Sequence, residues 1–381
     1  MKTAAIVCEY NPFHNGHKFH IEETKRQTGA DAVVLIMSGN FVQRGAVAIF
    51  DKALRAKAAI LGGADLVLEL PTPISCASAE FFASGAVSIL DALGVVDFLS
   101  FGAESPESED ILKIASLLAG EPKELSDKIK MYSSTGLSYP LARAKATEDI
   151  LGEDAVKILS SPNNILGIEY CKALIKLQSH ISPFPILRKG AGHDSKTTFE
   201  NIASATHIRD LILNGNQTEA EKYMPDFAVE IFKDAKRHSI KALEKSILCE
   251  LIKMPAEALA NIADVSEGLE NRIKAALTSS VSLDELIESV KTKRYTHSRI
   301  RRIILSAFLG ITDSQRHTAP MYIKVLDHNE TGQKVIATAK KSAILPIVRN
   351  TSQVNKLKNP DLKAIWEKEQ VFDRIFEMTA M

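Results

Sequence analysis

The first hundred residues alternate between short apolar runs and amphipathic stretches. Four apolar runs have strand length and no polar alternation: Ala4–Cys8, Ala32–Met37, Leu66–Leu70 and Val96–Phe101. Three helical patterns lie between them: His17–Gln27, Lys52–Leu61 and Ala77–Leu93. Continuous apolar strands separated by helices predict βαβ units whose parallel strands are buried on both faces. We therefore expect an α/β fold with a Rossmann-like, doubly wound parallel sheet and a ligand site at the carboxyl ends of its strands.

The rest of the chain is mainly helical. Residues 107–180 form helical patterns with a break at Ser160–Asn164, and a strand at Pro183–Leu187 precedes a loop at Lys189–Lys196. Further helices are expected at His207–Leu213, Glu219–Tyr223, Ala228–Lys253, Glu267–Ala276, Leu283–Lys291 and Ser298–Leu309. A small βαβ piece closes the chain: Met321–Leu326, a turn at Asn329–Gly332, a helix and Ala343–Val348. A length of 381 residues fits two domains, which we place at 1–215 and 216–381, the second mainly helical.

Composition excludes the membrane and secreted classes. Hydrophobic residues make up 45% and charged residues 25% of the chain, and no uncharged apolar run approaches bilayer length. The segment Met1–Tyr10 is interrupted by Glu9 and has no cleavage site, so it is a first strand and not a signal peptide. Four widely separated cysteines without metal-ligand spacing indicate reduced thiols, and we expect a cytoplasmic protein with no membrane partner.

Charge is unevenly distributed although the formal net charge is zero. Residues 291–350 carry 12 Lys and Arg against 3 Asp and Glu. This excess of positive charge favours an anionic partner for the C-terminal part.

The loop after the first strand carries the candidate chemistry. It reads Tyr10-Asn11-Pro12-Phe13-His14-Asn15-Gly16-His17 and opens a helix, where free N–H groups and the helix dipole favour a bound phosphate. Gly16 allows close approach of the backbone. His14 and His17 are placed to donate hydrogen bonds to an α-phosphate as negative charge builds up.

Two alternative roles for these histidines stay open. They can be surface or capping residues, or His14, His17 and His20 can hold zinc. Zinc is disfavoured because positions i and i+6 diverge by about 120° on a helix. No Walker-type loop and no G-x-G-x-x-G after a strand is present, which disfavours P-loop and dinucleotide-binding proteins.

The H-x-G-H pattern resembles the signature of the adenylyl-transferring nucleotidyltransferases. A second element, Ser204-Ala205-Thr206-His207-Ile208-Arg209, is similar to their I-S-S/G-T-x-I-R motif, with Ala205 where Ser or Gly is usual. The resemblance implies that Ser204, Thr206 and Arg209 hold the β- and γ-phosphates of ATP.

Further motifs narrow the resemblance to the bacterial tRNA(Met) cytidine acetate ligase family. The first of these motifs is the loop after the first strand, lengthened by one residue to begin at Glu9. The others, in chain order, are Met37–Gly45, Asp65–Pro71, Phe101–Glu104, Ser161–Gly167 and Lys291–Thr296. The matches run from residue 5 to about residue 310, and the last 70 residues match only loosely.

This resemblance implies a two-step ligase. Acetate attacks the α-phosphate of ATP to give acetyl-adenylate and pyrophosphate. The N4 amine of the wobble cytidine in elongator tRNA(Met) then takes the acetyl group, which yields N4-acetylcytidine and AMP. Mg²⁺ is expected on ATP, held mainly by phosphates and water, without a tightly bound protein metal and without an implied protein partner.

The resemblance also implies site residues. His14, His17 and Arg209 would be catalytic. The residues expected to bind ATP are Val7, Cys8, Glu9, Tyr10, Asn11, Pro12, Phe13, His14, Asn15, Gly16, His17, Lys18, Phe19, His20, Gly102, Asn163, Asn164, Arg188, Lys189, Ser204, Thr206 and Arg209. Several have structural alternatives: Gly102 as a strand-end turn, Asn163 or Asn164 as a helix cap, and Arg188 in a surface ion pair. Gln43 and Arg44 would serve either acetate or tRNA.

A dense basic cluster is expected to bind tRNA. It comprises Lys291, Lys293, Arg294, Arg299, Arg301 and Arg302. Tyr295 and His297 lie among these residues, and basic charge interleaved with an aromatic suits a phosphate backbone and a stacked base. The alternative is a solvated helix face.

Two other functions compete with the ligase. A small-molecule adenylyltransferase acting on phosphopantetheine or nicotinate mononucleotide would need neither this length nor the basic region. A tRNA-binding protein with a vestigial nucleotide site is disfavoured by the intact His14, Gly16, His17 and Arg209.

Overall fold

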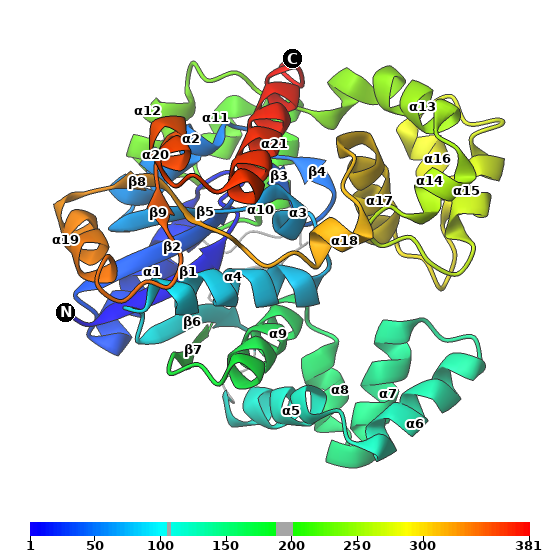
Figure 1. Ribbon diagram of the computed structural model, residues 1–381, viewed down its shortest axis with the longest axis horizontal. Helices are drawn as coiled ribbons and strands as arrows, with labels where there is room; N and C mark the ends of the chain where they lie inside the picture. The colour runs from blue at the N-terminus through cyan, green and yellow to red at the C-terminus, as the bar shows by residue number, and fades with distance from the viewer. Residues whose placement is uncertain (105–107, 188–200) are drawn as a thin grey trace.

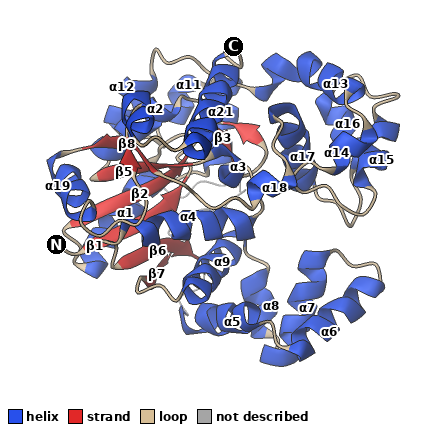
Figure 2. Cartoon of the chain, in the orientation of Figure 1, coloured by secondary structure: helices blue, strands red, loops and turns tan. Residues whose placement is uncertain are grey.

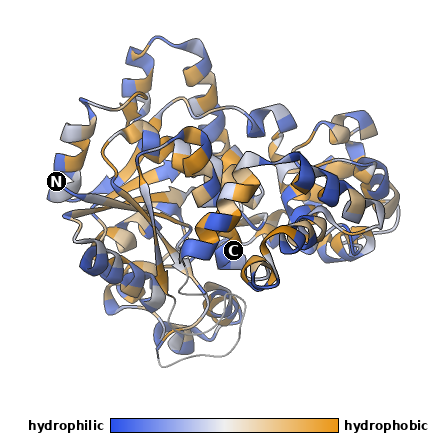
Figure 3. Ribbon diagram, turned by 90° about the horizontal axis from the view of Figure 1, so that it is seen from below, coloured by the Kyte–Doolittle hydropathy of each residue, from blue (hydrophilic) through white to orange (hydrophobic). Residues whose placement is uncertain are grey.

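The structure is a computed structural model, and it describes residues 1–104, 108–187 and 201–381. A sheet wrapped by helices lies on one side of the molecule, and two helical lobes extend from it, one of α5–α8 and one of α13–α18 (Figure 1). Most strands gather in one layer between helices (Figure 2), as the alternating pattern predicted. Hydrophobic and hydrophilic residues alternate along the helical ribbons (Figure 3), so most helices bury one side.

The main sheet in the described ranges has seven strands in the order β7-β6-β1-β2-β5-β8-β9. Their bounds are β1 Thr3–Cys8, β2 Ala32–Ser38, β5 Leu66–Leu70, β6 Phe98–Ala103, β7 Ser182–Leu187, β8 Ile323–His328 and β9 Ile347–Val348. The pairs among β7, β6, β1, β2 and β5 are parallel, whereas β8 runs antiparallel to β5. A separate hairpin pairs β3 (Phe41–Val42) with β4 (Ala46–Val47). The predicted doubly wound α/β fold is confirmed.

Helices cover both faces of this sheet. The N-terminal half contains α1 Asn15–Thr28, α2 Lys52–Leu61, α3 Thr72–Ser75, α4 Ala79–Leu93, α5 Ser108–Gly120, α6 Lys123–Ser134, α7 Tyr139–Leu151, α8 Asp154–Leu159 and α9 Pro162–Leu177. The break expected near Ser160 is therefore confirmed. Among the helices in the described ranges, none combines the length and the apolar character that crossing a bilayer requires.

The C-terminal half is mainly helical, as expected. Its helices are α10 Ala205–Leu213, α11 Gln217–Glu221, α12 Asp226–Phe232, the 3₁₀ helix η1 Ile240–Leu243, α13 Glu244–Lys253, α14 Ala256–Ala260, α15 Leu269–Ala276, α16 Leu283–Val290, α17 His297–Leu309, α18 Asp313–Arg316, α19 Glu330–Ala339, α20 Thr351–Lys356 and α21 Pro360–Glu377.

Alternate positions of the strands face two different cores. On β2, Val34 and Ile36 pack with α4, α9 and α19, whereas Val33, Leu35 and Met37 pack with α1, α2, α10 and α12. Because every residue of β2 is buried, the strand carries no polar alternation, which is why its sequence reads as a continuous apolar run.

One predicted helix is wrong. The stretch Ala228–Lys253 is not continuous, because α12 ends at Phe232 and α13 begins at Glu244. The intervening chain is used for long-range contacts: His238 donates its N–H to the Ile49 carbonyl at 3.0 Å and pairs with Ala380. Such tertiary contacts override a helical pattern and leave no periodic signal in the sequence.

The C-terminal βαβ piece is present and joins the N-terminal sheet. Strands β8 and β9 flank α19, and β8 pairs with β5. The turn expected at Asn329–Gly332 is the start of α19, where the Asn329 side chain accepts a hydrogen bond from the Gly332 N–H at 2.9 Å. A domain boundary at residue 215 stays a prediction.

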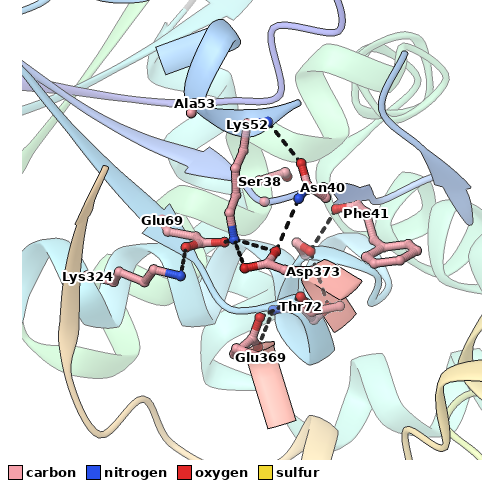
Figure 4. A network of polar contacts seen from close by, with 12 residues as sticks. Ser38, Asn40, Phe41, Lys52, Ala53, Glu69, Thr72, Lys324, Glu369 and Asp373 are labelled. Atoms are coloured by element: carbon pink, nitrogen blue, oxygen red, sulfur yellow. Dashed lines mark hydrogen bonds and ion pairs between the residues drawn. The ribbon is translucent and has the colours of Figure 1, made fainter. Parts of the chain in front are cut away.

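The last helix is tied to the sheet by buried charges (Figure 4). On α21, the Glu369 carboxylate accepts hydrogen bonds from the N–H of Thr72 at 2.8 Å and from its hydroxyl at 2.7 Å. Burial, reinforced by the negative charge of Glu69, raises the pKa of Glu369 to about 7, while the nearby Lys52 opposes the shift.

The raised pKa of Glu369 predicts a pH-dependent stability. The folded state binds this proton more tightly than the unfolded state, so the contribution is complete below about pH 4.5 and is lost as the pH rises through about 7. Glu369→Gln keeps the contacts to Thr72 without the charge, because a hydroxyl both donates and accepts. Urea unfolding should therefore find the variant more stable than the natural protein at pH 8 by up to about 3 kcal/mol, and little different at pH 4.5.

The control is Glu367→Gln. Glu367 is an exposed acidic residue on the same helix, and its carboxylate pairs with Lys363. It should leave the pH dependence of unfolding unchanged. Identical pH profiles for Glu369→Gln and the natural protein would show that Glu369 is ionised in the fold.

Candidate active site

A cavity opens where the winding of the sheet changes direction. From β1 the chain proceeds through β2 and β5 to one side, and then returns to place β6 and β7 on the other side. Such a switch point leaves a crevice beyond the carboxyl ends of the two central strands. The residues that follow β1 and those at the end of β6 line a cavity of about 220 Å³ at this place.

Most of the expected ATP-binding residues line this cavity. They are Val7, Cys8, Glu9, Tyr10, Asn11, His14, Gly16, His17, Phe19, His20, Gly102, Asn163, Thr206 and Arg209. They come from β1, α1, β6, α9 and α10, so the fold brings together segments up to 200 residues apart. Whether each contacts ATP stays a prediction.

Six other expected residues lie outside the lining and have structural contacts. Phe13 is fully buried, and its ring packs closely against Gly62: a Cβ added to Gly62 would lie only 2.3 Å from the ring. Asn15 donates to the Asn201 carbonyl, and Ser204 caps α10. The remaining three are Pro12, Lys18 and Asn164. Arg188 and Lys189 lie outside the described residues.

The two histidines of the loop form the cap of α1. His14 is the N-cap residue, and its Nδ1 accepts the Gly16 N–H at 3.1 Å. His17 Nδ1 accepts the His14 N–H at 3.3 Å, which completes a capping box. The two rings stack with centroids 3.6 Å apart. Capping, one of the alternative roles, is therefore real and coexists with the position of both rings in the cavity wall.

This capping fixes the chemistry of the neutral rings. A nitrogen that accepts a hydrogen bond carries no proton, so neutral His14 and His17 carry theirs on Nε2. Each ring therefore offers an Nε2–H donor from a side chain that the helix start already holds. The arrangement suits donation to an oxygen that gains negative charge.

Gly16 makes this arrangement sterically feasible. A Cβ at this position would lie 3.0 Å from Cε1 and 3.1 Å from Nδ1 of His14. The His14 ring is 5% exposed and stacks on His17, so a side chain at position 16 would have to push this packed ring aside.

The three histidines do not converge on a zinc site. His20 Nε2 lies 3.0 Å from the Ser100 hydroxyl, which also contacts Thr24, while His14 and His17 use Nδ1 for the cap. Within the described ranges, no group of three His, Cys, Asp or Glu side chains is arranged to hold a metal ion.

The start of α10 forms the other polar wall. Arg209 donates to the Asn11 carbonyl at 2.7 Å and to the Thr206 hydroxyl at 3.0 Å. The guanidinium thus joins α10 to the loop after β1. Positive charge and the N-terminus of a nine-residue helix meet there, an arrangement that suits an anionic ligand.

The β6 side of the cavity is more apolar and contains two residues outside the quoted motifs, Phe82 and Tyr170. Asn163, Leu166 and Tyr170 lie on one face of α9 and line the cavity together with Phe101 and Phe82. Their i, i+3, i+7 spacing is a signal that the sequence offered. The helix cap is Ser161, so neither Asn163 nor Asn164 serves as the N-cap.

Both asparagines instead hold the end of β6. Asn164 Oδ1 accepts the Glu104 N–H at 2.9 Å, and Asn163 Nδ2 donates to the Glu104 carboxylate at 2.6 Å. These contacts hold the end of β6, where Gly102 lines the cavity, and an apolar wall with a few polar groups suits a nucleobase.

A buried arginine holds the loops behind the cavity. Arg55 on α2 is fully buried and donates to the carbonyls of Glu9, Ser38, Gly39 and Phe50. Burial lowers its pKa to about 10, so it stays charged at neutral pH. No motif or periodicity indicated this role.

The structure divides the predicted tRNA-binding cluster into two kinds of residue. Arg302 pairs with Asp264 at 2.8 Å, Arg299 donates to the Asp264 carbonyl and to Ser266, and Arg294 pairs with Glu267 at 2.7 Å. The second kind is exposed to solvent and comprises Lys291, Lys293 and Arg301. Arg294 is exposed as well, although it is paired. Tyr295 is 8% exposed within the core of the helical lobe, so it is not available to stack on a base.

Comparisons with known proteins agree with this site. A family model described as HIGH Nucleotidyl Transferase matches residues 1–380. The tRNA(Met) cytidine acetate ligase of Acetivibrio thermocellus is 40% identical, over 99% of this chain and 95% of its own. The Clostridium tetani protein of the same name is 38% identical, over 96% and 94%.

Two crystal structures of Thermotoga maritima TmcAL are also similar. The apo form is 31% identical with a TM-score of 0.95, covering 100% of this chain and 96% of that one. The form bound with alpha-thio ATP is 32% identical with a TM-score of 0.92, covering 100% and 95%.

The contact at Gly16 predicts a selective loss of nucleotide binding. Gly16→Ala should displace the His14 ring by a few tenths of an ångström and weaken ATP binding about tenfold or more, measured by calorimetry. Gly120→Ala, at a helical position where nothing lies within 4 Å of the new Cβ, is the control and should bind ATP normally. Normal ATP affinity in Gly16→Ala would show that the position of His14 does not matter for binding.

Proposed function

The chain belongs to the HIGH nucleotidyl transferase family and, within it, to the tRNA(Met) cytidine acetate ligases, and from this membership we propose its reaction. It activates acetate with ATP and transfers the acetyl group to N4 of the wobble cytidine of elongator tRNA(Met). The observation that carries the proposal is the pair of capping histidines in a switch-point cavity, in a chain that matches these ligases over nearly its whole length.

In the first step, a carboxylate oxygen of acetate forms a bond to the α-phosphorus of ATP. The bond from that phosphorus to the bridging oxygen breaks, and pyrophosphate leaves with the electron pair. His14 and His17 donate from Nε2 to the non-bridging α-phosphate oxygens, while Thr206 and Arg209 hold the β- and γ-phosphates. ATP enters as its magnesium complex, with the ion held by phosphates and water.

In the second step, the cytidine amine attacks the acetyl carbonyl carbon. The bond between that carbon and the phosphate oxygen breaks, AMP leaves, and the amine loses one proton to solvent. The wobble base lies in a single-stranded loop, so the enzyme reaches its amine without opening a duplex. We expect the reaction to occur in the cytoplasm, where tRNA and ATP are found together.

The competing functions fit less well. The family membership favours the ligase over an adenylyltransferase for phosphopantetheine or nicotinate mononucleotide. A binding protein with a vestigial site has no need of two capped histidines and an arginine held at one cavity. Exchange of pyrophosphate into ATP distinguishes the three: the ligase requires acetate, the adenylyltransferase requires another substrate, and the binding protein shows no exchange.

The direct test is isotope transfer into tRNA. Incubation of bulk tRNA with the protein, ATP, Mg²⁺ and labelled acetate should give labelled N4-acetylcytidine by nucleoside mass spectrometry. His17→Ala should lose the product and the acetate-dependent pyrophosphate exchange while binding tRNA nearly normally, because His17 touches the phosphate and not the tRNA. Loss of tRNA binding in the same variant would contradict this role, and absence of label with the natural protein would refute the proposed reaction.

A second prediction separates the two kinds of arginine on α17. Arg301 is exposed, and among the described residues no ion-pair or hydrogen-bond partner is found for it, whereas Arg302 pairs with the part-buried Asp264. Arg301→Gln should weaken tRNA binding. It should also reduce, by about 1, the magnitude of the slope of the logarithm of the tRNA-binding constant against the logarithm of the salt concentration. The temperature of thermal unfolding should be unchanged. Arg302→Gln should mainly lower the unfolding temperature, because Asp264 loses one of its guanidinium partners.

The two variants are each other's control, since both remove one positive charge from the same helix. Equal effects on the salt slope would show that the charge of the helix, and not an individual contact, attracts tRNA. No effect of Arg301→Gln on tRNA affinity would mean that this side of α17 is a solvated face.

A further inference from the structure

The tip of the β3–β4 hairpin reaches the cavity from the side of β2. Gln43 and Arg44 at this tip are half-buried and line the cavity. In the sheet, β2 and β6 lie on opposite sides of β1. The hairpin therefore borders the cavity on the side away from Gly102 and Asn163.

Two guanidinium groups line the cavity in the described ranges, those of Arg209 and Arg44. Arg209 is held by the Asn11 carbonyl and Thr206, at the wall assigned to the triphosphate. Acetate, however, is an anion that has to come into contact with the anionic α-phosphate. Repulsion between two anions is strong in a partly desolvated cavity, so a second positive group is needed where acetate enters.

We propose that Arg44 binds the carboxylate of acetate and that the β3–β4 hairpin forms the acetate side of the cavity. This inference rests on the proposed function. The guanidinium holds one carboxylate oxygen and offsets the repulsion, while the other oxygen forms the bond to the α-phosphorus as pyrophosphate leaves. No proton is transferred, because acetate reacts as its anion.

The hairpin is held at its tip and at its base by hydrogen bonds to the core. The Gln43 N–H donates to the Glu9 carboxylate at 2.9 Å, and the Phe41 carbonyl accepts the Ser75 hydroxyl at 2.9 Å. Just before the hairpin, the Asn40 carbonyl accepts the Ala48 N–H at 2.9 Å. The tip is therefore not an independent loop, and its position depends on Asn40.

Asn40 is in turn held by a buried charge network (Figure 4). Its Oδ1 accepts the Lys52 N–H at 2.9 Å, and its Nδ2 donates to Asp373 at 3.1 Å. The Lys52 ammonium contacts Glu69 at 2.6 Å and both Asp373 oxygens at 2.5 and 2.6 Å. Asp373, on the last helix, thus acts on the hairpin through Asn40 and is a positioning residue.

On its other side the hairpin presses against α17. Gly45 has a φ of +70°, and a Cβ there would lie 2.4 Å from the backbone nitrogen of Arg302. Phe41 and Val47 pack in one apolar cluster with Leu305 of α17 and Phe376 of α21. Contacts from both helices therefore leave the hairpin little freedom, as a substrate-binding wall requires.

The test of Arg44 is acetate-dependent exchange of labelled pyrophosphate into ATP. Arg44→Ala should raise KM for acetate at least tenfold and leave KM for ATP within about twofold, because the triphosphate is held elsewhere. Arg44→Lys should lie between, since it keeps the positive charge but loses the planar guanidinium with its fixed donor geometry. The control is Arg26→Ala, which removes an exposed arginine paired with Glu23 and should change neither constant.

The test of Asp373 is a double-mutant cycle on the same assay. Asp373→Asn alone should raise KM for acetate by a smaller factor than Arg44→Ala. Since Asp373 acts through the hairpin, the double variant with Arg44→Ala and Asp373→Asn should have the same KM for acetate as Arg44→Ala alone. Additive effects would show that Asp373 influences the reaction by another route and would overturn its positioning role.

The outcomes separate this inference from the proposed function. If the natural protein exchanges pyrophosphate with acetate but Arg44→Ala raises KM for ATP, or only weakens tRNA binding, the assignment of Arg44 is wrong and the ligase stands. If the natural protein shows no acetate-dependent exchange, both fall. Because Arg44 is at a half-exposed tip, its variants test the assignment even if Asp373→Asn does not fold.

Discussion

The site depends on one buried guanidinium. Arg55 joins the carbonyls of Glu9, directly after β1, and Ser38, the last residue of the adjacent parallel strand β2, and also reaches Gly39 and Phe50. Parallel strands leave their last carbonyls without partners at the end of the sheet, and an unsatisfied buried carbonyl costs about 1–3 kcal/mol. A single planar donor fork satisfies several of them at once and fixes the loops relative to each other. The loop after β1 carries the histidines, and the chain after β2 carries the hairpin, so both walls of the cavity share this anchor.

The C-terminal residues complete the N-terminal sheet. Strand β8 pairs with β5, Lys324 on β8 contacts Glu69 at 2.5 Å, and α21 brings Asp373 to Lys52. The carboxylate of Glu69 is buried, yet its two lysine neighbours keep its pKa low. Buried charges of this kind are neutral for stability at best, but removal of one partner is strongly unfavourable. The network therefore specifies how the last helix docks more than it adds to stability. The sheet that carries the cavity and the end of the chain are therefore joined in one structural unit.

The fold was predictable because its signals are local. Continuous apolar strands and the loop at the start of α1 predicted the parallel sheet, the switch-point cavity and the position of His14 and His17. The rest depends on contacts between distant residues. The break between α12 and α13 follows from contacts of His238 with Ile49 and Ala380, which no periodicity reveals. Charge counts identified the basic segment near α17 but not its ion pairs. Asp264 pairs with Arg302 and Arg316, although it precedes them by 38 and 52 residues in the chain.

The capping box explains why the same two histidines belong to the fold and to the chemistry. An N-cap needs an acceptor, and an imidazole supplies it with Nδ1. Using Nδ1 in this way leaves Nε2 as the proton carrier of the neutral ring, which is the form that donates to a phosphate oxygen. A serine or aspartate would cap the helix as well but would offer no such donor. The cap also holds both rings stacked in the structure without a ligand, so the proposed reaction at the α-phosphate would require no rearrangement of their orientation. Stability at the helix start and the proposed stabilisation of the transition state thus place the same requirement on the loop, and the absence of a side chain at Gly16 leaves room for the His14 ring that serves both.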